Sequence, residues 1–98
     1  MVVRIVKLTF RENEIENFKQ VLEESKDKIR AFPGVMHLQM LQSTSDPCIF
    51  FTHSHWKTAE DLEQYRHSEL FKSTWAKTKP LFSAPAEAWS NNELHLLP

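Results

Sequence analysis

The chain has 98 residues, 41% of them hydrophobic and 26% charged, and its formal net charge is −1. This composition is ordinary for a globular protein, and the length suits one domain with a core of its own. No segment concentrates positive charge and no apolar run approaches ~20 residues, so we predict neither nucleic acid nor a membrane as a partner. One cysteine and one glycine leave no intrachain disulfide and no glycine-rich phosphate loop. Because the N-terminus lacks the pattern of a signal peptide, we predict a cytoplasmic protein.

The first part of the chain predicts a strand, a helix and a second strand. Residues 2–10 are rich in β-branched side chains, which favour a strand. Apolar residues at helical spacing over 15–29 predict a helix, and Asn13 is its predicted cap. The helix ends at Phe32-Pro33-Gly34, because proline cannot continue it and glycine tolerates a left-handed exit. Residues 35–42 predict the second strand, and one of its faces carries Met36, Leu38 and Met40.

The third predicted strand, residues 48–56, follows a hairpin loop over 42–47 and is the most informative segment. Successive side chains of a strand point to opposite faces. One face therefore carries Phe50, Thr52, Ser54 and Trp56, and the other carries Ile49, Phe51, His53 and His55. Both sets contain large apolar groups, so we predict that both faces are covered. Helices of the same chain would cover one face and a second copy of the chain the other.

A second helical region is predicted over residues 58–79, with Thr58 as its N-cap. Ser68 offers another cap and marks a predicted break or bend, and Pro80 ends the region. Residues 86–90 predict a short fourth strand at an edge of the sheet.

The predicted order β-α-β-β-α-β is that of an α+β, ferredoxin-like domain with a four-stranded antiparallel sheet. Both helical regions then cover one face and leave the other bare. We therefore predict a homodimer that pairs the bare faces and forms a dimeric α/β barrel. One domain, 1–98, is expected, with a core over about 2–91. The leucine-rich tail, 92–98, is expected to lie against another surface, such as the partner subunit.

Several short segments resemble the antibiotic biosynthesis monooxygenase family of dimeric α/β barrels. They are Phe32-Pro33-Gly34, Asp46-Pro47 in the hairpin, Trp56 at a strand end, and the segments 58–62 and 68–71. The similarity extends over about residues 3–91. Activities in that family include the oxidation of quinols and polyphenols by O2 without metal or flavin, and the degradation of haem.

The haem-degrading branch of the family carries an Asn on strand one, a Trp ending strand three and a haem-ligating His on the second helix. The corresponding residues here are Val6, Trp56 and Trp75. Two of the three differ, including the ligand, so the resemblance implies no haem cleavage by that mechanism, and no cofactor is predicted. The quinol and polyphenol oxygenases often have a His on the second helix, near Tyr65 and His67 of this chain.

Five aromatic residues are candidates for binding a ligand. Trp56 either stacks on a planar aromatic ligand, as the resemblance implies, or packs under the second helical region as ordinary core. The same alternatives apply to four residues that would line one cavity from the helices: Phe18, Tyr65, Phe71 and Trp75.

Three histidines are candidates for a catalytic base, namely His53, His55 and His67, because imidazole can take a phenolic proton at neutral pH. His53 and His55 also have the H-x-H spacing of some metal sites, with His37 as a third candidate ligand on the neighbouring strand. Neither strand contains Asp or Glu, so we predict no metal. The alternative role of these histidines is hydrogen bonding at the sheet or dimer surface.

Two functions remain open from the sequence. The first is a cofactor-free monooxygenase of an electron-rich aromatic small molecule, a quinol or polyphenol, whose ionised form donates an electron to O2. The protein would supply a dry cavity, Trp56 as a stacking wall and one of the three histidines as base. The second is a non-catalytic dimeric module of the same fold that binds a small apolar molecule.

Overall fold

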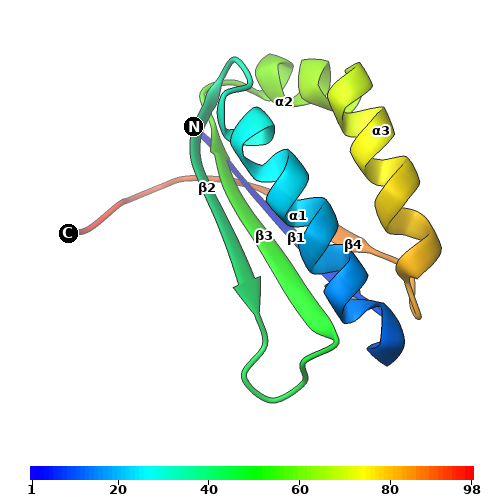
Figure 1. The fold of residues 1–98 in the computed structure, drawn as a ribbon. Helices are drawn as coiled ribbons and strands as arrows, with labels where there is room; N and C mark the ends of the chain where they lie inside the picture. Colours follow the sequence, from blue (N-terminus) through cyan, green and yellow to red (C-terminus); the bar gives the residue numbers. More distant parts are fainter.

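The computed structural model describes residues 1–98 and contains a four-stranded sheet with three α-helices on one side (Figure 1). The strands are β1 (Val2–Thr9), β2 (Val35–Gln42), β3 (Ile49–Trp56) and β4 (Glu87–Asn92). The helices are α1 (Ile15–Arg30), α2 (Ala59–Arg66) and α3 (Glu69–Thr78), with 3₁₀ turns at Glu12–Glu14 and Lys79–Leu81. The sheet order β2-β3-β1-β4 is antiparallel throughout, which confirms the predicted ferredoxin-like α+β fold. None of the helices has the length and apolar composition that crossing a bilayer requires.

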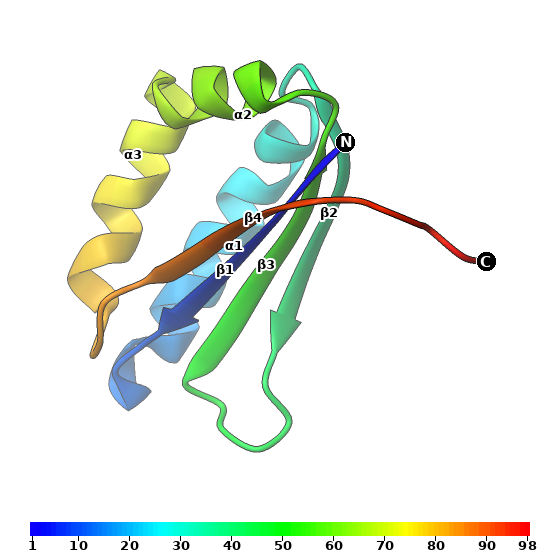
Figure 2. The same cartoon turned by 180° about the vertical axis from the view of Figure 1, so that it is seen from behind.

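The register of the sheet confirms the two faces predicted for β3. Phe50 and Trp56, on the face toward the helices, are 5% and 1% exposed. The residues of β1 paired with this face are Val2, Arg4, Val6 and Leu8. The alternate residues of β3, including His53 and His55, lie on the opposite face, which no helix crosses (Figure 2). The sheet therefore has a covered face and an uncovered face.

Two buried clusters lie between the sheet and the helices. The larger consists of Leu8, Phe10, Phe18 and Phe50, and the rings of Phe10 and Phe18 stack with centroids 4.0 Å apart. The smaller consists of Val35, Trp56 and Leu62. Full burial of side chains of this size stabilises the fold by about 1.5–3 kcal/mol each. Members of both clusters also line the cavity described below.

The predicted break in the second helical region falls at Ser68. Its hydroxyl accepts a hydrogen bond from the Phe71 N–H at 3.1 Å and donates one to the Tyr65 carbonyl at 2.6 Å. Thr58 caps α2 as predicted, because its hydroxyl accepts from the Asp61 N–H at 3.1 Å. A cap of this kind contributes about 1 kcal/mol. The resulting change of direction between α2 and α3 (Figure 1) lets both helices line one cavity.

Gly34 is required at the turn that leads into β2. Its φ of +92° lies in the left-handed region that glycine tolerates. A Cβ at this position would also collide with the side chain of Asp61. The Gly34 carbonyl accepts a hydrogen bond from the Lys57 N–H at 2.8 Å. The turn thus fixes the start of α2 beside the end of α1.

Three local predictions are corrected by the structure. Asn13 does not cap α1, because it lies within the preceding 3₁₀ turn and α1 begins without a side-chain cap. Met36 does not share the face of Leu38 and Met40. A β-bulge after Val35 shifts the register there, so Val35 is buried while Met36 is 51% exposed. The fourth strand starts one residue later than predicted and extends to Asn92.

Candidate functional site

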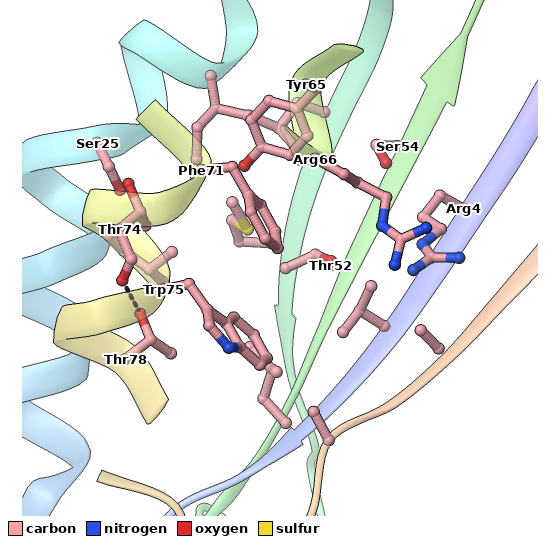
Figure 3. Close-up of a pocket in the computed structure, with 18 of the residues that line it drawn as sticks. Arg4, Ser25, Thr52, Ser54, Tyr65, Arg66, Phe71, Thr74, Trp75 and Thr78 are labelled. Carbon is pink, nitrogen blue, oxygen red and sulfur yellow. Dashed lines mark hydrogen bonds between the residues drawn. The ribbon is translucent and has the colours of Figure 1, made fainter. Parts of the chain in front are cut away.

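A cavity of about 320 Å³ lies between the helices and the covered face of the sheet (Figure 3). Fifteen of its 22 lining residues are hydrophobic. The strands β1 and β3 contribute one wall, including Val6 and Thr52, and the helices α1 and α3 contribute the facing wall, including Phe18 and Trp75. Small-molecule sites are mostly apolar and have volumes of roughly 300–1,000 Å³. This cavity is therefore the candidate functional site.

The five aromatic residues predicted to bind a ligand all line this cavity: Phe18, Trp56, Tyr65, Phe71 and Trp75. Four of them form a continuous row. The ring centroids of Trp56 and Tyr65 are 5.1 Å apart, those of Tyr65 and Phe71 5.3 Å, and those of Phe71 and Trp75 5.8 Å. The Trp56 N–H donates to the Ser54 hydroxyl at 2.9 Å, so this buried indole has its polar atom satisfied. Trp56 is thus both a core residue and part of the cavity wall, and contact of the row with a ligand stays a prediction.

None of the three candidate catalytic histidines lines the cavity. His53 and His55 lie on the uncovered face, and the sheet itself separates them from the aromatic row. His67 lies at the end of α2 with its side chain 74% exposed and hydrogen-bonded to Glu63 at 3.0 Å. No His, Lys, Asp or Glu is present among the lining residues. The subunit therefore places no side chain in the cavity that could take a proton from a phenol at neutral pH.

A cluster of histidines occupies the uncovered face instead. The rings of His37, His53 and His55 have centroids 4.9–5.4 Å apart. His53 also hydrogen-bonds the Gln39 side chain at 3.2 Å, and a Glu93 oxygen lies 3.9 Å from His55 Nδ1. Desolvation by burial, followed by the charges of His55 and His37, lowers the pKa of His53. No group of three His, Cys, Asp or Glu side chains is arranged to hold a metal ion.

Two arginines that are not among the predicted site residues lie at the edge of the cavity. Arg4 comes from β1 and Arg66 from the end of α2, and both line the cavity (Figure 3). The Arg4 guanidinium donates a hydrogen bond to the Ser90 hydroxyl at 2.9 Å. Arg66 forms an exposed ion pair with Glu63 at 3.4 Å. The position of Arg4 in its strand already indicated this, because residues two apart in a strand share a face and Val6 lies on the covered face.

Tyr65 carries the phenolic group of the cavity. Burial raises the pKa of Tyr65 to about 12, so its hydroxyl stays protonated at neutral pH. The hydroxyl points inward among the side chains that line the cavity (Figure 3). Tyr65 can therefore donate a hydrogen bond to an oxygen of a bound molecule, but it cannot serve as a base.

The fold and the cavity together define a ferredoxin-like α+β protein with an apolar interior cavity. The model of the antibiotic biosynthesis monooxygenase family matches residues 1–77, and the chain belongs to this family. The family predicted from the resemblance is thus confirmed.

Three solved structures illustrate the similarity. A Nitrosomonas europaea protein whose name assigns it provisionally to the antibiotic biosynthesis monooxygenases is 22% identical, with a TM-score of 0.91 over 97% of this chain and 100% of its own. A conserved protein from Methanosarcina mazei Go1 is 17% identical, with a TM-score of 0.88 over 95% and 93% of the two chains. Rv0793 from Mycobacterium tuberculosis is 15% identical, with a TM-score of 0.90 over 99% and 98%. At these identities the likeness establishes the fold. The comparison with curated proteins found no match.

Proposed function

We propose that the protein is a cofactor-free monooxygenase that uses O2 to oxidise an electron-rich aromatic small molecule, a quinol or polyphenol. The observation that carries this proposal is the 320 Å³ cavity with its row of aromatic side chains. Membership of the antibiotic biosynthesis monooxygenase family supports oxygenase chemistry. An apolar cavity also excludes water, which protects the reactive intermediates of such a reaction.

The proposed reaction balances without an external reductant. An ionised phenol transfers an electron to O2, and a C–O bond then forms at a hydrogen-bearing ring carbon ortho or para to the phenolic oxygen. The resulting peroxide anion takes up the proton that the phenol released and becomes a hydroperoxide. Its O–O bond then breaks, and the outer hydroxyl leaves with the hydrogen of that carbon as one water, which leaves a carbonyl group. One phenol and one O2 thus give one quinone and one water, and the four electrons that O2 accepts all come from the ring.

The cavity side chains have distinct proposed roles. Trp56, Phe71 and Trp75 hold the flat faces of the ring and set its orientation. Tyr65 donates a hydrogen bond to an oxygen of the bound ligand. The three histidines are not part of this mechanism, because the sheet or the exposed position of their side chains separates them from the cavity.

Oxygen consumption with a panel of phenols and hydroquinones tests the proposal. We expect uptake of one O2 per molecule of 1-naphthol or of a related bicyclic phenol converted. The variant Tyr65→Phe should lower kcat about tenfold, because it removes one hydrogen bond worth roughly 1.4 kcal/mol. The control His67→Ala should leave kcat unchanged. Absence of enzyme-dependent uptake across the panel, or a larger loss in His67→Ala than in Tyr65→Phe, would contradict the proposal.

The second candidate function is a non-catalytic module that binds a small apolar molecule. The lack of His, Lys, Asp and Glu among the lining residues favours it, because binding requires no proton transfer. Quenching of tryptophan fluorescence by the same panel, with no O2 uptake by any member, would identify this function. Uptake that depends on Tyr65 would exclude it.

We also propose that two subunits pair through their uncovered faces to form the dimeric α/β barrel. That face carries Ile5 and Phe51 beside Leu41 and Trp89, which are 43% and 46% exposed. An apolar surface of this extent is typical of an interface. Three exposed leucines of the tail would lie against the partner: Leu94, Leu96 and Leu97. In this proposal residues 1–98 form one domain. The cytoplasmic location of the protein stays a prediction.

A further inference from the structure

We propose that Arg4 and Arg66 bind an ionised oxygen of the ligand at the cavity edge, so that the ligand is held as its anion. The ligand class is then an apolar, planar molecule with an ionised phenol or enol group. This inference rests on the proposed function, because it concerns the ionisation state of the molecule held in the same cavity.

The two guanidinium groups lie at the edge of the cavity, where the polar end of an otherwise apolar ligand would remain. On the covered face of β1, Leu8 is buried in the core, Val6 follows it in the cavity wall, and Arg4 completes the series. Arg66 reaches the same edge from the end of α2 (Figure 3). The cavity wall therefore changes from apolar at Leu8 and Val6 to cationic at the edge formed by Arg4 and Arg66.

The chain balances the positive charges at this edge only in part. Arg4 bonds the neutral hydroxyl of Ser90 and forms no ion pair, so most of its five N–H donors are available. Glu63 is the one carboxylate paired with Arg66, and its other oxygen bonds His67 outside the cavity. An exposed ion pair of this kind is weak, typically below about 1 kcal/mol. Arg66 can therefore turn to a ligand oxygen at little cost.

The lowered pKa of Arg4 indicates that this edge favours an anion. Burial lowers the pKa of Arg4, and the positive charge of Arg66 lowers it further, while Glu63 opposes both effects. The charged form of Arg4 is thus disfavoured at this edge, and an anion between the two guanidiniums would remove that penalty. By the same interaction, a positive charge within ~4–6 Å of an acidic group lowers the pKa of that group by about 1–3 units.

This arrangement accounts for the absence of a base among the lining residues. A phenol whose pKa is lowered by two guanidiniums loses its proton to water as it binds, and no side chain has to accept it. Tyr65 stays protonated, so it does not accept this proton either. The substrate thus reaches O2 already in the electron-rich form that the oxidation requires.

Spectrophotometric titration of 1-naphthol bound to the protein, kept under argon to prevent oxidation, tests the inference. Absorbance of the naphtholate ion reports the pKa of the bound ligand. We expect this pKa to lie about 1–3 units below that of free 1-naphthol in the wild type. Arg4→Met and Arg66→Met should each lose about half of the shift or more. Lys72→Met, which removes a charge from the exposed surface of α3, should retain all of it.

Two results would overturn the inference: an unshifted pKa of bound 1-naphthol in the wild type, or an equal shift in Arg66→Met and Lys72→Met. Arg66 lies at an exposed helix end, so its variant should fold even if Arg4→Met does not. The neutral analogue 1-methoxynaphthalene separates this inference from the proposed function. If it binds while the pKa of 1-naphthol is unshifted, the anion site is wrong and the cavity stands. If the pKa shifts but O2 is not consumed, the anion site stands and the oxygenase proposal fails.

Discussion

The two faces of the sheet are built from the same strands but have opposite environments. Trp56, on the covered face, is 1% exposed and belongs to the cavity wall, whereas Trp89, on the uncovered face, is 46% exposed. The covered face combines apolar side chains with one arginine, Arg4, at the edge of the cavity. The uncovered face combines apolar side chains with three histidines. Residues next to each other in sequence therefore serve two different surfaces.

This comparison shows that the candidate ligand cavity and the proposed dimer interface lie on opposite sides of one sheet. Ser54 bonds the indole of Trp56 on one side, while its neighbours His53 and His55 bond each other on the other side. Because alternate residues along β3 point to opposite sides, substitutions at adjacent positions should have separable effects. The following predictions test that separation, beginning with the largest effect.

Trp56→Ala and Trp89→Ala compare the same substitution on the two faces. Removal of the buried indole of Trp56 leaves a void and should lower the free energy of unfolding by about 3–5 kcal/mol. Removal of the half-exposed indole of Trp89 should lower it by less than about 1 kcal/mol under conditions in which the subunit is monomeric. Urea denaturation followed by circular dichroism measures both values.

The same pair also separates binding from assembly. Trp56→Ala should weaken binding of 1-naphthol, and Trp89→Ala should leave it unchanged. Comparable losses of stability in both variants would show that the two faces are not different in the way described, and would place Trp89 in the core of the subunit.

Ile5→Glu tests whether the uncovered face is the dimer interface. Ile5 lies in the middle of that face, paired with His53 of β3 and Trp89 of β4. A carboxylate buried in that interface should raise the dissociation constant about 30-fold, the effect of losing about 2 kcal/mol. Sedimentation velocity over a range of protein concentrations measures the change.

Thr44→Glu is the matched control, because it adds the same charge in the exposed hairpin loop. It should leave the dissociation constant unchanged. A wild-type protein that sediments as a monomer at every concentration would refute the dimer, as would equal effects of Ile5→Glu and Thr44→Glu.

Much of the fold could be predicted because it follows from local patterns. The alternation along β3 gave both faces correctly, and Ser68 gave the break between α2 and α3, since a hydroxyl that can cap a helix acts within a few residues. The exposure of Met36 could not be predicted in the same way. A β-bulge depends on how β2 pairs with β3, and no residue of the strand signals it.

The candidate site was predictable in its apolar part and not in its polar part. Large aromatic side chains at helical or strand spacing point to the same interior, so the five predicted wall residues do meet. The histidines were proposed as bases from their chemistry alone, although strand parity already put His53 and Trp56 on opposite faces. Arg66 was beyond prediction, because the position of a long side chain at a helix end depends on tertiary structure.

The smallest expected effect is a dependence of stability on the protonation of His53. Burial, followed by the charges of His55 and His37, lowers the pKa of His53 in the folded state, so folding favours the neutral ring. In the unfolded chain the pKa of a histidine is about 6.5. As pH falls, the unfolded state therefore binds the proton first. The contribution is fully present above about pH 6.5 and is lost as pH falls through that value toward the lower folded pKa.

Urea denaturation between about pH 7.5 and about pH 5 measures this effect. The wild type should lose more stability over that interval than His53→Gln, which cannot be charged. His95→Gln, in the exposed tail, should keep the wild-type slope. Parallel curves of stability against pH for the wild type and His53→Gln would show that protonation of His53 does not affect stability. Because the proposed dimer buries this cluster further, the dissociation constant should increase as the pH falls, while the stability decreases.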